Sequence, residues 1–197
     1  MSRNASEKII VITAPSGAGK TSITKYLMQQ FPQLSFSVSA TTRSPRAKET
    51  DGKDYHFISA ESFKNKIEAG DFIEWEMVYE GTYYGTLKSE MDKIWQRNDI
   101  PVLDIDVKGA LQIKQLYSTQ AMTLFIAPPS VDTLRERLVL RGTETPDSLK
   151  KRIEKAGYEL SFQHQFDHII LNDDLNTACS QAAAIVSAFL NTQPAKV

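Results

Sequence analysis

An eight-residue stretch near the N-terminus constrains what this chain can fold into more than any other feature. It follows a β-branched run over residues 9–13 and precedes a helical pattern over residues 22–30. Its residues are Ala14, Pro15, Ser16, Gly17, Ala18, Gly19, Lys20 and Thr21. A strand, a glycine-rich turn, a Lys-Thr pair and a helix in this order are typical of a phosphate-binding loop, or P-loop. Backbone N–H groups of such a loop surround an anion at the positive end of the helix, so the stretch predicts a phosphate site.

Two side chains of the loop carry specific chemistry, and one position departs from the usual motif. Lys20 can reach the outer phosphates as a point charge, and the Thr21 hydroxyl is placed to ligate Mg²⁺. Ala14 stands where the motif normally has its first glycine. A positive φ would strain alanine by about 1 kcal/mol or more. Because Gly17 and Gly19 remain for the turn, we expect Ala14 only to end the strand.

Strand and helix patterns alternate along most of the chain. Strands are predicted over residues 9–13, 34–39, 101–106, 122–126 and 168–171, and helices over residues 21–31, 89–97, 109–117, 131–140, 147–162 and 175–190. Alternation of this kind predicts an α/β fold, with a five-stranded parallel sheet flanked by helices. Residues 40–86 break the rhythm with short strands, turns and one helix over 59–69, so we expect an inserted mixed β subdomain there.

Composition narrows the class of protein. The chain has 197 residues, a net charge of −1 and one cysteine, Cys179. This length suits one domain with inserted subdomains, and the small net charge provides no general field that would attract nucleic acid. Residues 1–8 are polar and no apolar run approaches the ~20 residues of a membrane span. We therefore expect a cytoplasmic protein with no leader peptide, membrane segment or disulfide, and with disordered ends over residues 1–8 and 191–197.

Two aspartates end a predicted apolar strand. Asp104 and Asp106 close the run that starts at residue 101, and ligands of open α/β sheets bind outside the carboxyl ends of the strands. Either carboxylate could therefore meet Mg²⁺ or a substrate across from Lys20. The alternative is that an aspartate caps the helix that begins near Gly109.

Five arginines are candidates for phosphate binding. They are Arg43, Arg46, Arg137, Arg141 and Arg152. Guanidinium groups bind phosphate oxygens bidentately, so the first two could hold a phosphate, although a solvated loop explains them equally well. The last three could belong to a mobile helical lid that brings positive charge onto a transferring phosphoryl group. The alternative for these three is ordinary surface charge.

One acidic residue interrupts an apolar run. Glu74 lies in the sequence Phe-Ile-Glu-Trp, and a buried carboxylate requires partners. Guanine offers two adjacent donors, at N1 and N2, to one carboxylate. A structural ion pair is the alternative interpretation.

The motifs, taken in order, resemble those of the guanylate kinase family over essentially residues 8–190. The stretches that carry the resemblance are APSGAGKT (14–21), FSVSATTRSPR (36–46), GKDY (52–55), FIEW (72–75), YYGT (83–86), LDID (103–106), IAPPS (126–130), RGTET (141–145) and NDD (172–174). The resemblance implies a three-part kinase. Its core comprises residues 8–38, 87–127 and 164–190, its GMP-binding subdomain residues 39–86, and its lid residues 128–163.

The resemblance also implies a role for each matching residue. The residues implied to hold the phosphate of GMP are Arg43, Arg46, Tyr55 and Tyr84, and those at the guanine end are Ser39, Glu74, Thr86 and Asp106. The residues implied to neutralise the transferred phosphoryl group are Lys20, Arg137, Arg141 and Arg152. Asp104 and Thr21 are implied to lie near Mg²⁺, and Asn172 over the adenine of ATP.

The implied reaction is transfer of a phosphoryl group from ATP to GMP, and also to dGMP, with Mg²⁺ as cofactor and no nucleic-acid or membrane partner. The sequence is equally compatible with a monomer and a homo-oligomer. One alternative is a scaffold domain that binds peptides; such domains tend to lose the P-loop and lid residues that this chain keeps. A kinase of another nucleoside monophosphate is the second alternative. Glu74 and Thr86 argue against it, because adenine has no N1–H donor.

Overall fold

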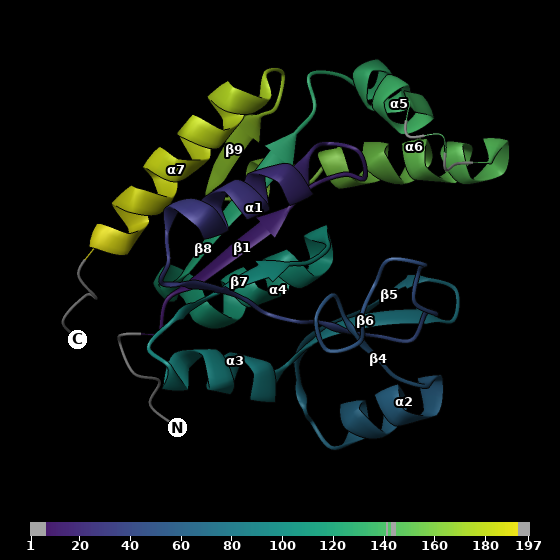
Figure 1. Cartoon of the computed structure of the whole chain (residues 1–197). Helices are drawn as coiled ribbons and strands as arrows, with labels where there is room; N and C mark the ends of the chain where they lie inside the picture. The colour runs from purple at the N-terminus through teal and green to yellow at the C-terminus, as the bar shows by residue number, and fades with distance from the viewer. Residues whose placement is uncertain (1–6, 141, 143–144, 193–197) are drawn as a thin grey trace.

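The central sheet of the protein has five parallel strands. The structure is a computed structural model that describes residues 7–140, 142 and 145–192, so the expectations for residues 1–6, Arg141, residues 143–144 and the tail beyond 192 lie outside it. The strand order is β2 (Leu34–Phe36), β7 (Ile100–Asp104), β1 (Ile9–Thr13), β8 (Ala121–Ala127) and β9 (His168–Leu171). The predicted parallel α/β core is confirmed (Figure 1).

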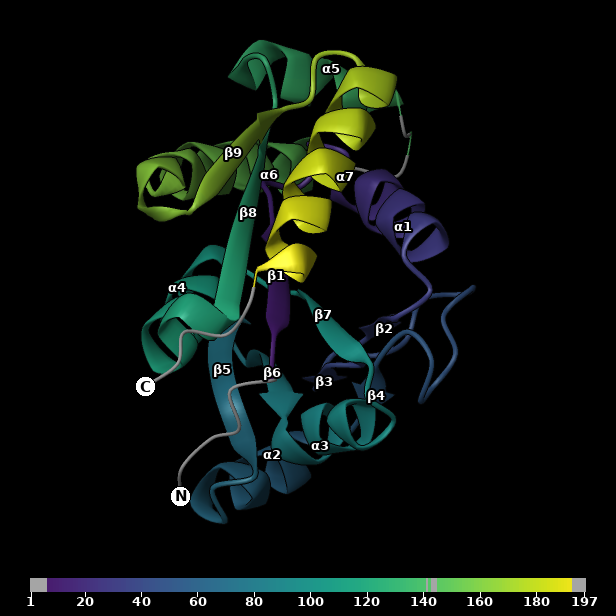
Figure 2. The ribbon, with the colours of Figure 1, turned by 90° about the vertical axis from the view of Figure 1, so that its left-hand side faces the viewer.

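Helices cover both faces of this sheet. They are α1 (Lys20–Gln30), α3 (Lys88–Gln96), α4 (Val107–Tyr117) and α7 (Leu175–Asn191), and the short 3-10 turns η1 (Ser118–Gln120) and η2 (Gln163–Gln165) precede β8 and β9. Ile10 and Ile12 of β1 belong to the apolar cluster that includes α1 and α7. Ile9 and Val11 belong to the cluster that includes α3 and α4, because successive strand residues point to opposite faces. Figure 2 shows α1 and α7 on one side of the sheet and α4 on the other.

A second, mixed sheet lies beside the core. Its order is β4 (His56–Phe57), β3 (Ala40–Thr41), β6 (Thr82–Leu87) and β5 (Phe72–Tyr79), with β3 parallel to β4 and antiparallel to β6. Helix α2 (Ala60–Glu68) packs on this sheet through Phe63, whose ring stacks on Phe72 with 4.4 Å between centroids. The inserted mixed β unit expected from the broken rhythm is therefore present.

Two further helices form a small unit of their own above the P-loop. They are α5 (Val131–Leu140) and α6 (Pro146–Leu160), and they share an apolar cluster of Leu134, Leu138 and Ala156. Thr145 begins α6 by accepting a hydrogen bond from the backbone N–H of Ser148. Figure 1 shows this helical pair and the second sheet on the same side of the central sheet.

The strand predicted over residues 34–39 is wrong in its second half. The strand β2 ends at Phe36, and the chain then crosses to the second sheet, where Ala40 pairs with Gly85. Phe36 is 37 % exposed, whereas Ser37 and Ser39 are buried, so the burial pattern is the opposite of the one that the alternation suggests. The sequence pattern misleads here because Ser39 faces a polar cavity rather than solvent.

The strand predicted over residues 101–106 also ends early. The strand β7 stops at Asp104, and Asp106 is the N-cap of α4, where its carboxylate accepts a hydrogen bond from the Gly109 N–H at 2.9 Å. The alternative interpretation of an aspartate as a helix cap is therefore correct for Asp106.

Lys8 joins the beginning of the described chain to its end. Its ammonium group donates hydrogen bonds to the backbone carbonyls of Phe189, Leu190 and Thr192 at 2.8, 2.9 and 2.6 Å. The last carbonyl groups of a helix have no intrahelical partner, and a cation there also interacts favourably with the helix dipole. Lys8 thus caps α7 from a segment that lies more than 180 residues away.

We expect Lys8→Met to lower the free energy of unfolding by about 1–2 kcal/mol, because three carbonyl groups lose a charged donor. Thermal unfolding followed by circular dichroism should show a melting temperature lower by several degrees. The matched control is Lys25→Met, which changes an exposed lysine of α1. Equal melting temperatures for the two variants would contradict the capping role.

Candidate active site

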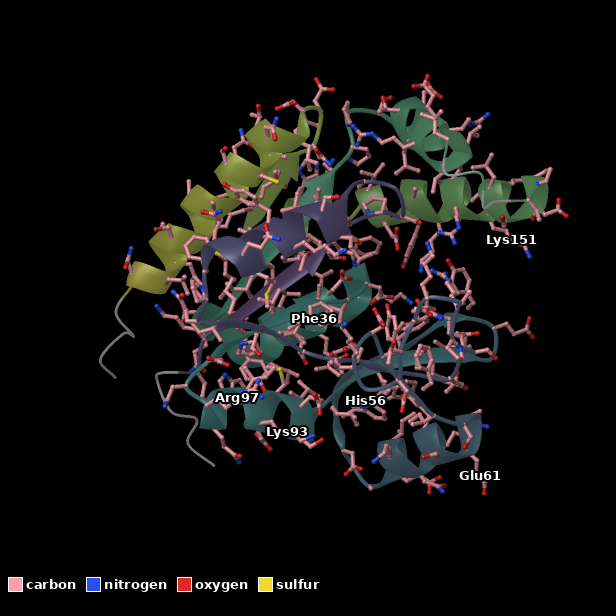
Figure 3. The ribbon with its side chains drawn as sticks, viewed as in Figure 1. Phe36, His56, Glu61, Lys93, Arg97 and Lys151 are labelled. Atoms are coloured by element: carbon pink, nitrogen blue, oxygen red, sulfur yellow. The ribbon has the colours of Figure 1, made fainter. Side chains whose placement is uncertain are left out.

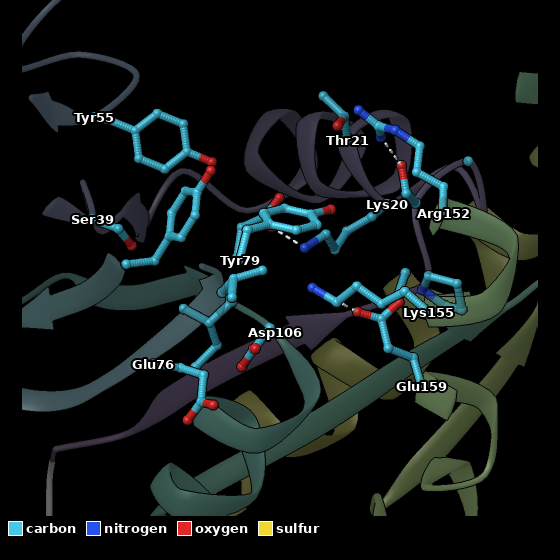
Figure 4. Close-up of a pocket in the computed structure, with 18 of the residues that line it drawn as sticks. Lys20, Thr21, Ser39, Tyr55, Glu76, Tyr79, Asp106, Arg152, Lys155 and Glu159 are labelled. Carbon is cyan, nitrogen blue, oxygen red and sulfur yellow. Dashed lines mark hydrogen bonds and ion pairs between the residues drawn. The ribbon is translucent and has the colours of Figure 1, made fainter. Parts of the chain in front are cut away.

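One cavity of about 470 Å³ lies between the P-loop, the second sheet and α6. It is polar, and most residues predicted from the sequence to form the site line it. Those residues are Ala14, Pro15, Ser16, Gly17, Gly19, Lys20, Thr21, Ser39, Arg46, Tyr55, Glu74, Tyr84, Asp104, Asp106 and Arg152. Figure 4 shows that their side chains converge on the cavity from all three units. The predicted residues outside its lining are Ala18, Arg43, Thr86, Arg137 and Asn172, whereas Arg141 lies outside the described residues.

The P-loop has the turn that phosphate binding requires. Gly17 and Gly19 have φ angles of 97° and 96°, in the left-handed region that favours glycine. Ala14 is not among the described residues with positive φ, so the expectation that alanine is unstrained there is confirmed. Asn172 lies directly behind the loop, where its Nδ2 donates to the carbonyl of Ala18 at 2.6 Å. A Cβ on Gly19 would also approach that nitrogen closely, so a larger residue there would have to displace the Asn172 side chain.

Lys20 and Asp104 meet at the carboxyl ends of β1 and β7. The Lys20 ammonium forms an ion pair with the Asp104 carboxylate. Both side chains are about one-fifth exposed, at 21 % and 22 %, so the pair is accessible from the cavity. Thr21 follows Lys20 in the first turn of α1 and lines the same cavity. A phosphate group that enters the loop would meet the backbone N–H groups, this ammonium group and a hydroxyl group.

Glu74 is a buried carboxylate at the opposite end of the cavity. Its side chain is only 3 % exposed and accepts a hydrogen bond from the Thr86 hydroxyl at 2.6 Å. Among the described residues, no lysine or arginine forms an ion pair with Glu74. Within the part of the chain that the structure describes, the alternative of a structural ion pair at Glu74 is therefore wrong. Burial raises the pKa of Glu74 to about 7, the hydrogen bond from Thr86 opposes this shift, and the charge of Asp106 adds to it.

Arg43 is held by an acidic residue that sequence reasoning did not identify. Its two terminal nitrogens donate to the Glu49 carboxylate at 2.6 and 2.7 Å, and its Nε donates to the Tyr84 hydroxyl at 3.1 Å. The guanidinium also lies 4.9 Å from the ring centroid of Tyr55. The hydrogen bonds from Arg43 lower the pKa of Glu49 to about 2, so this carboxylate is ionised at neutral pH. The loop is thus an organised charged cluster rather than a solvated loop, and Arg46 at its exposed end lines the cavity.

Two arginines of the helical pair α5 and α6 contact the phosphate-loop region in different ways. Arg152 of α6 donates to the Ser16 hydroxyl at 2.5 Å, so α6 and the P-loop are in direct contact. Arg137 of α5 donates to the backbone carbonyl of Asn172 at 3.0 Å. Both arginines therefore have specific partners, and neither is a solvated surface charge.

Further side chains line the cavity that the sequence did not single out. Those from β5 are Glu76, Val78 and Tyr79, and those from α6 are Ser148, Lys151, Lys155 and Glu159. Figure 3 shows Lys151 on the side of α6 that faces the second sheet. The α6 residues recur at positions 148, 151, 155 and 159, which is one face of a helix. Apolar positions 149, 153 and 156 form the other face, so helical periodicity could have identified this polar face.

The arrangement suits one kind of chemistry. A phosphate site at the P-loop faces a second polar site across a single cavity, and cationic side chains of α6 lie between them. Phosphoryl transfer requires this geometry, because donor and acceptor must be aligned while the charge of the transferred group is neutralised. On a parallel α/β core that carries this loop, these features define a P-loop kinase.

Comparisons with known proteins identify the family. The guanylate kinase family model matches residues 6–189. The chain is 46 % identical to a guanylate kinase of Bacteroides fragilis over 93 % of this chain and 90 % of that one. It is 47 % identical to a guanylate kinase of Salinibacter ruber over 93 % and 97 % of the two chains. The crystal structure of guanylate kinase from Anaplasma phagocytophilum superposes with a TM-score of 0.77 at 28 % identity, covering 94 % of this chain and 87 % of that one. The chain belongs to the guanylate kinase family.

The raised pKa of Glu74 makes a testable statement about stability. The folded protein holds a proton at Glu74 up to a pH of about 7, whereas the unfolded chain releases it near 4.5. Stability from this group is therefore present below the unfolded value and is lost as the pH rises through about 7. We expect the unfolding free energy of Glu74→Gln, minus that of the wild type, to increase by about 2 kcal/mol between pH 5 and pH 8.

Urea denaturation at the two pH values measures this difference directly. The control is Glu61→Gln, which changes an exposed acidic residue of α2. Its unfolding free energy minus that of the wild type should be the same at pH 5 and pH 8. If the unfolding free energy of Glu74→Gln minus that of the wild type were the same at pH 5 and pH 8, burial would not raise the pKa of Glu74.

Proposed function

We propose that this protein transfers the γ-phosphoryl group of ATP to GMP, giving ADP and GDP, and that dGMP also serves as an acceptor. The observation that carries the proposal is that buried Glu74 and the P-loop Lys20 line one cavity. The two oxygens of the Glu74 carboxylate offer about four acceptor positions, so hydrogen bonds from Thr86 leave capacity for a ligand. In a family of guanylate kinases, that ligand is a guanine base.

In this proposal the second sheet and its loops, together with the start of α4, form the site for GMP. Glu74 binds guanine in its ionised form, in which the carboxylate accepts hydrogen bonds from N1–H and N2–H, and Thr86 orients that carboxylate. Ser39 and Asp106 line the same end of the cavity and provide further polar contacts. Gly109 is part of this site, because a Cβ there would come within 2.5 Å of a Glu74 oxygen. The residues that hold the phosphate of GMP are Arg43, Arg46, Tyr55 and Tyr84.

The P-loop and the lid bind ATP and act on the transferred group. Backbone N–H groups of residues 14–21 hold the phosphates, and Lys20 moves its charge from Asp104 to the phosphate oxygens. Asn172 supports the loop from behind, and the region around it accommodates the adenine. An oxygen of the GMP phosphate attacks the γ-phosphorus, the bond to the bridging oxygen breaks, and ADP leaves. Lys20, Arg137, Arg141 and Arg152 neutralise the negative charge during this step.

The residues at the P-loop fit the Mg²⁺ ion that such a reaction uses. Thr21 offers a hydroxyl oxygen and Asp104 a carboxylate oxygen in one cavity, and hard oxygen ligands are those that Mg²⁺ prefers. Among the described residues, no cluster of three or more acidic, histidine or cysteine side chains could hold a metal alone. Mg²⁺ typically takes one or two protein ligands and completes its shell with phosphate oxygens and water. When bound, the ion would neutralise phosphate charge and orient the phosphate chain of ATP.

The division of labour follows the three units. We assign residues 8–38, 87–127 and 164–190 to the core, residues 39–86 to the GMP-binding subdomain and residues 128–163 to the lid.

We also place the reaction in the cytoplasm, as part of purine nucleotide metabolism. None of the described helices is long and apolar enough to cross a bilayer.

The acceptor specificity tests the proposed function. ADP release from Mg·ATP is measured with GMP, dGMP, AMP, CMP, UMP and IMP as separate acceptors. We expect rapid turnover with GMP and dGMP only, because a site built to hydrogen-bond one base edge rejects analogues without that edge by ~10⁴-fold. Turnover with AMP, CMP or UMP would contradict the guanine site. GMP binding without turnover would instead identify a binding domain.

The role of Lys20 is tested in the same assay. We expect Lys20→Ala to lower kcat at least about 10²-fold, because the transferred group loses a positioned charge. The fold should persist, since Lys20 is part of the polar cavity and not of an apolar cluster. Lys25→Ala, on the exposed side of the same helix, is the control. Near-normal turnover by Lys20→Ala would remove Lys20 from the mechanism.

A further inference from the structure

Helix α6 presents three ionic side chains to the cavity that the proposed mechanism does not use, Lys151, Lys155 and Glu159, and of these Lys151 is exposed. Lys155 and Glu159 both line the cavity, one and two turns beyond Arg152 on the same face of the helix. Their side chains are 26 % and 8 % exposed, so neither is a solvated surface group. Figure 4 shows Lys155 directed from α6 into the space that Lys20 also enters.

Lys155 crosses the cavity to reach the second sheet. Its Nζ atom lies 4.9 Å from the ring centroid of Tyr79 at the end of β5, and 3.5 Å from a carboxylate oxygen of Glu159. A cation over an aromatic ring gains only about 0.5–2 kcal/mol. A hydrogen bond from an ammonium group to a phosphate oxygen is stronger, because both partners are charged. Tyr79 therefore provides a contact that a phosphate group in the cavity would displace.

Glu159 lies where a carboxylate is costly to bury and adds little to the stability of the helix. It is buried, and burying a carboxylate is unfavourable unless a cation compensates. The compensating charge is Lys155, four residues earlier, and a lysine that precedes a glutamate is the less favourable order for an i,i+4 helix pair. Burial raises the pKa of Glu159, and the charges of Lys155 and Lys20 oppose that shift. Helix stability alone thus does not explain why this pair is turned inward.

We propose that Lys155 is a further phosphate-contacting residue of the transfer reaction and that Glu159 positions it, an inference that rests on the proposed function. The ammonium group of Lys155 binds a non-bridging oxygen of the phosphoryl group between donor and acceptor, opposite Lys20. Glu159 holds the flexible lysine side chain toward that point and lowers the entropic cost of ordering it. The lid would then contribute a point charge in addition to its guanidinium groups.

Steady-state kinetics with GMP and Mg·ATP test this assignment in five variants and the wild type. The variants are Lys155→Met, Lys155→Arg, Glu159→Gln, the double variant Lys155→Met/Glu159→Gln, and the control Lys150→Met on the exposed face of α6. We expect Lys155→Met to lower kcat at least about fivefold with little change in either KM, because its contact forms on the transferring group. Lys155→Arg should keep more of the activity, and Lys150→Met should behave as the wild type.

The double variant separates positioning from a merely structural role. If Glu159 acts through Lys155, then Glu159→Gln lowers kcat in the wild type but has no further effect once Lys155 is methionine. Equal factors in both backgrounds would overturn the positioning role, and a smaller than about fivefold loss in Lys155→Met would overturn the phosphate contact. Circular dichroism checks folding, with Lys155→Gln as the substitute if methionine prevents it. Absence of GMP turnover in the wild type would instead overturn the proposed function, and this inference with it.

Discussion

The parallel register of β1 against β7 is the constraint on which the site depends. Ile12 pairs with Asp104, so the strand that leads into the P-loop ends beside the strand that ends in an acid. Parallel strands end at the same edge of a sheet, and Lys20 therefore meets Asp104 without any special arrangement of loops. Both apolar faces of β1 are buried under helices, so packing on the two sides of the sheet holds this strand at the centre of the core. The packing of the core and the position of the P-loop therefore both depend on β1, residues Ile9–Thr13.

The opposite end of the cavity shows a different balance, in which polar function overrides the pattern of burial. Glu74 is buried on β5 while its neighbour Trp75 is 40 % exposed, the reverse of what their chemistry predicts. The cost of the buried carboxyl group is limited by the hydrogen bond from Thr86. Gly109 leaves room for it at the start of α4, and Asp106, which caps that helix, faces the same space. Asp106 therefore caps a helix and lines the cavity at the same time.

The contrast between the apolar core and the buried polar residues of the cavity explains what could be predicted from the sequence. The five-stranded core was predictable because β-branched runs and amphipathic helices alternate in it, and the P-loop because its spacing is specific. The break after Phe36 was not, because Ser37 and Ser39 are buried, Ser39 against the polar cavity, and mimic the outward half of a strand. Glu49 was overlooked because an acid in a polar loop has no distinguishing pattern until the fold brings it to Arg43. Lys155 and Glu159 were overlooked because α6 carries many charged residues. Their spacing nevertheless matches the side of α6 that lines the cavity.

The pairing of Arg43 with Glu49 has a consequence for selectivity among anions. The carboxylate is tethered six residues from the guanidinium and occupies both of its terminal nitrogens, so it acts as a built-in competitor at high effective concentration. An anion that binds Arg43 has to displace this carboxylate, so an anion that is also anchored elsewhere competes better than a free one. The loop thus imposes a threshold on ligand binding.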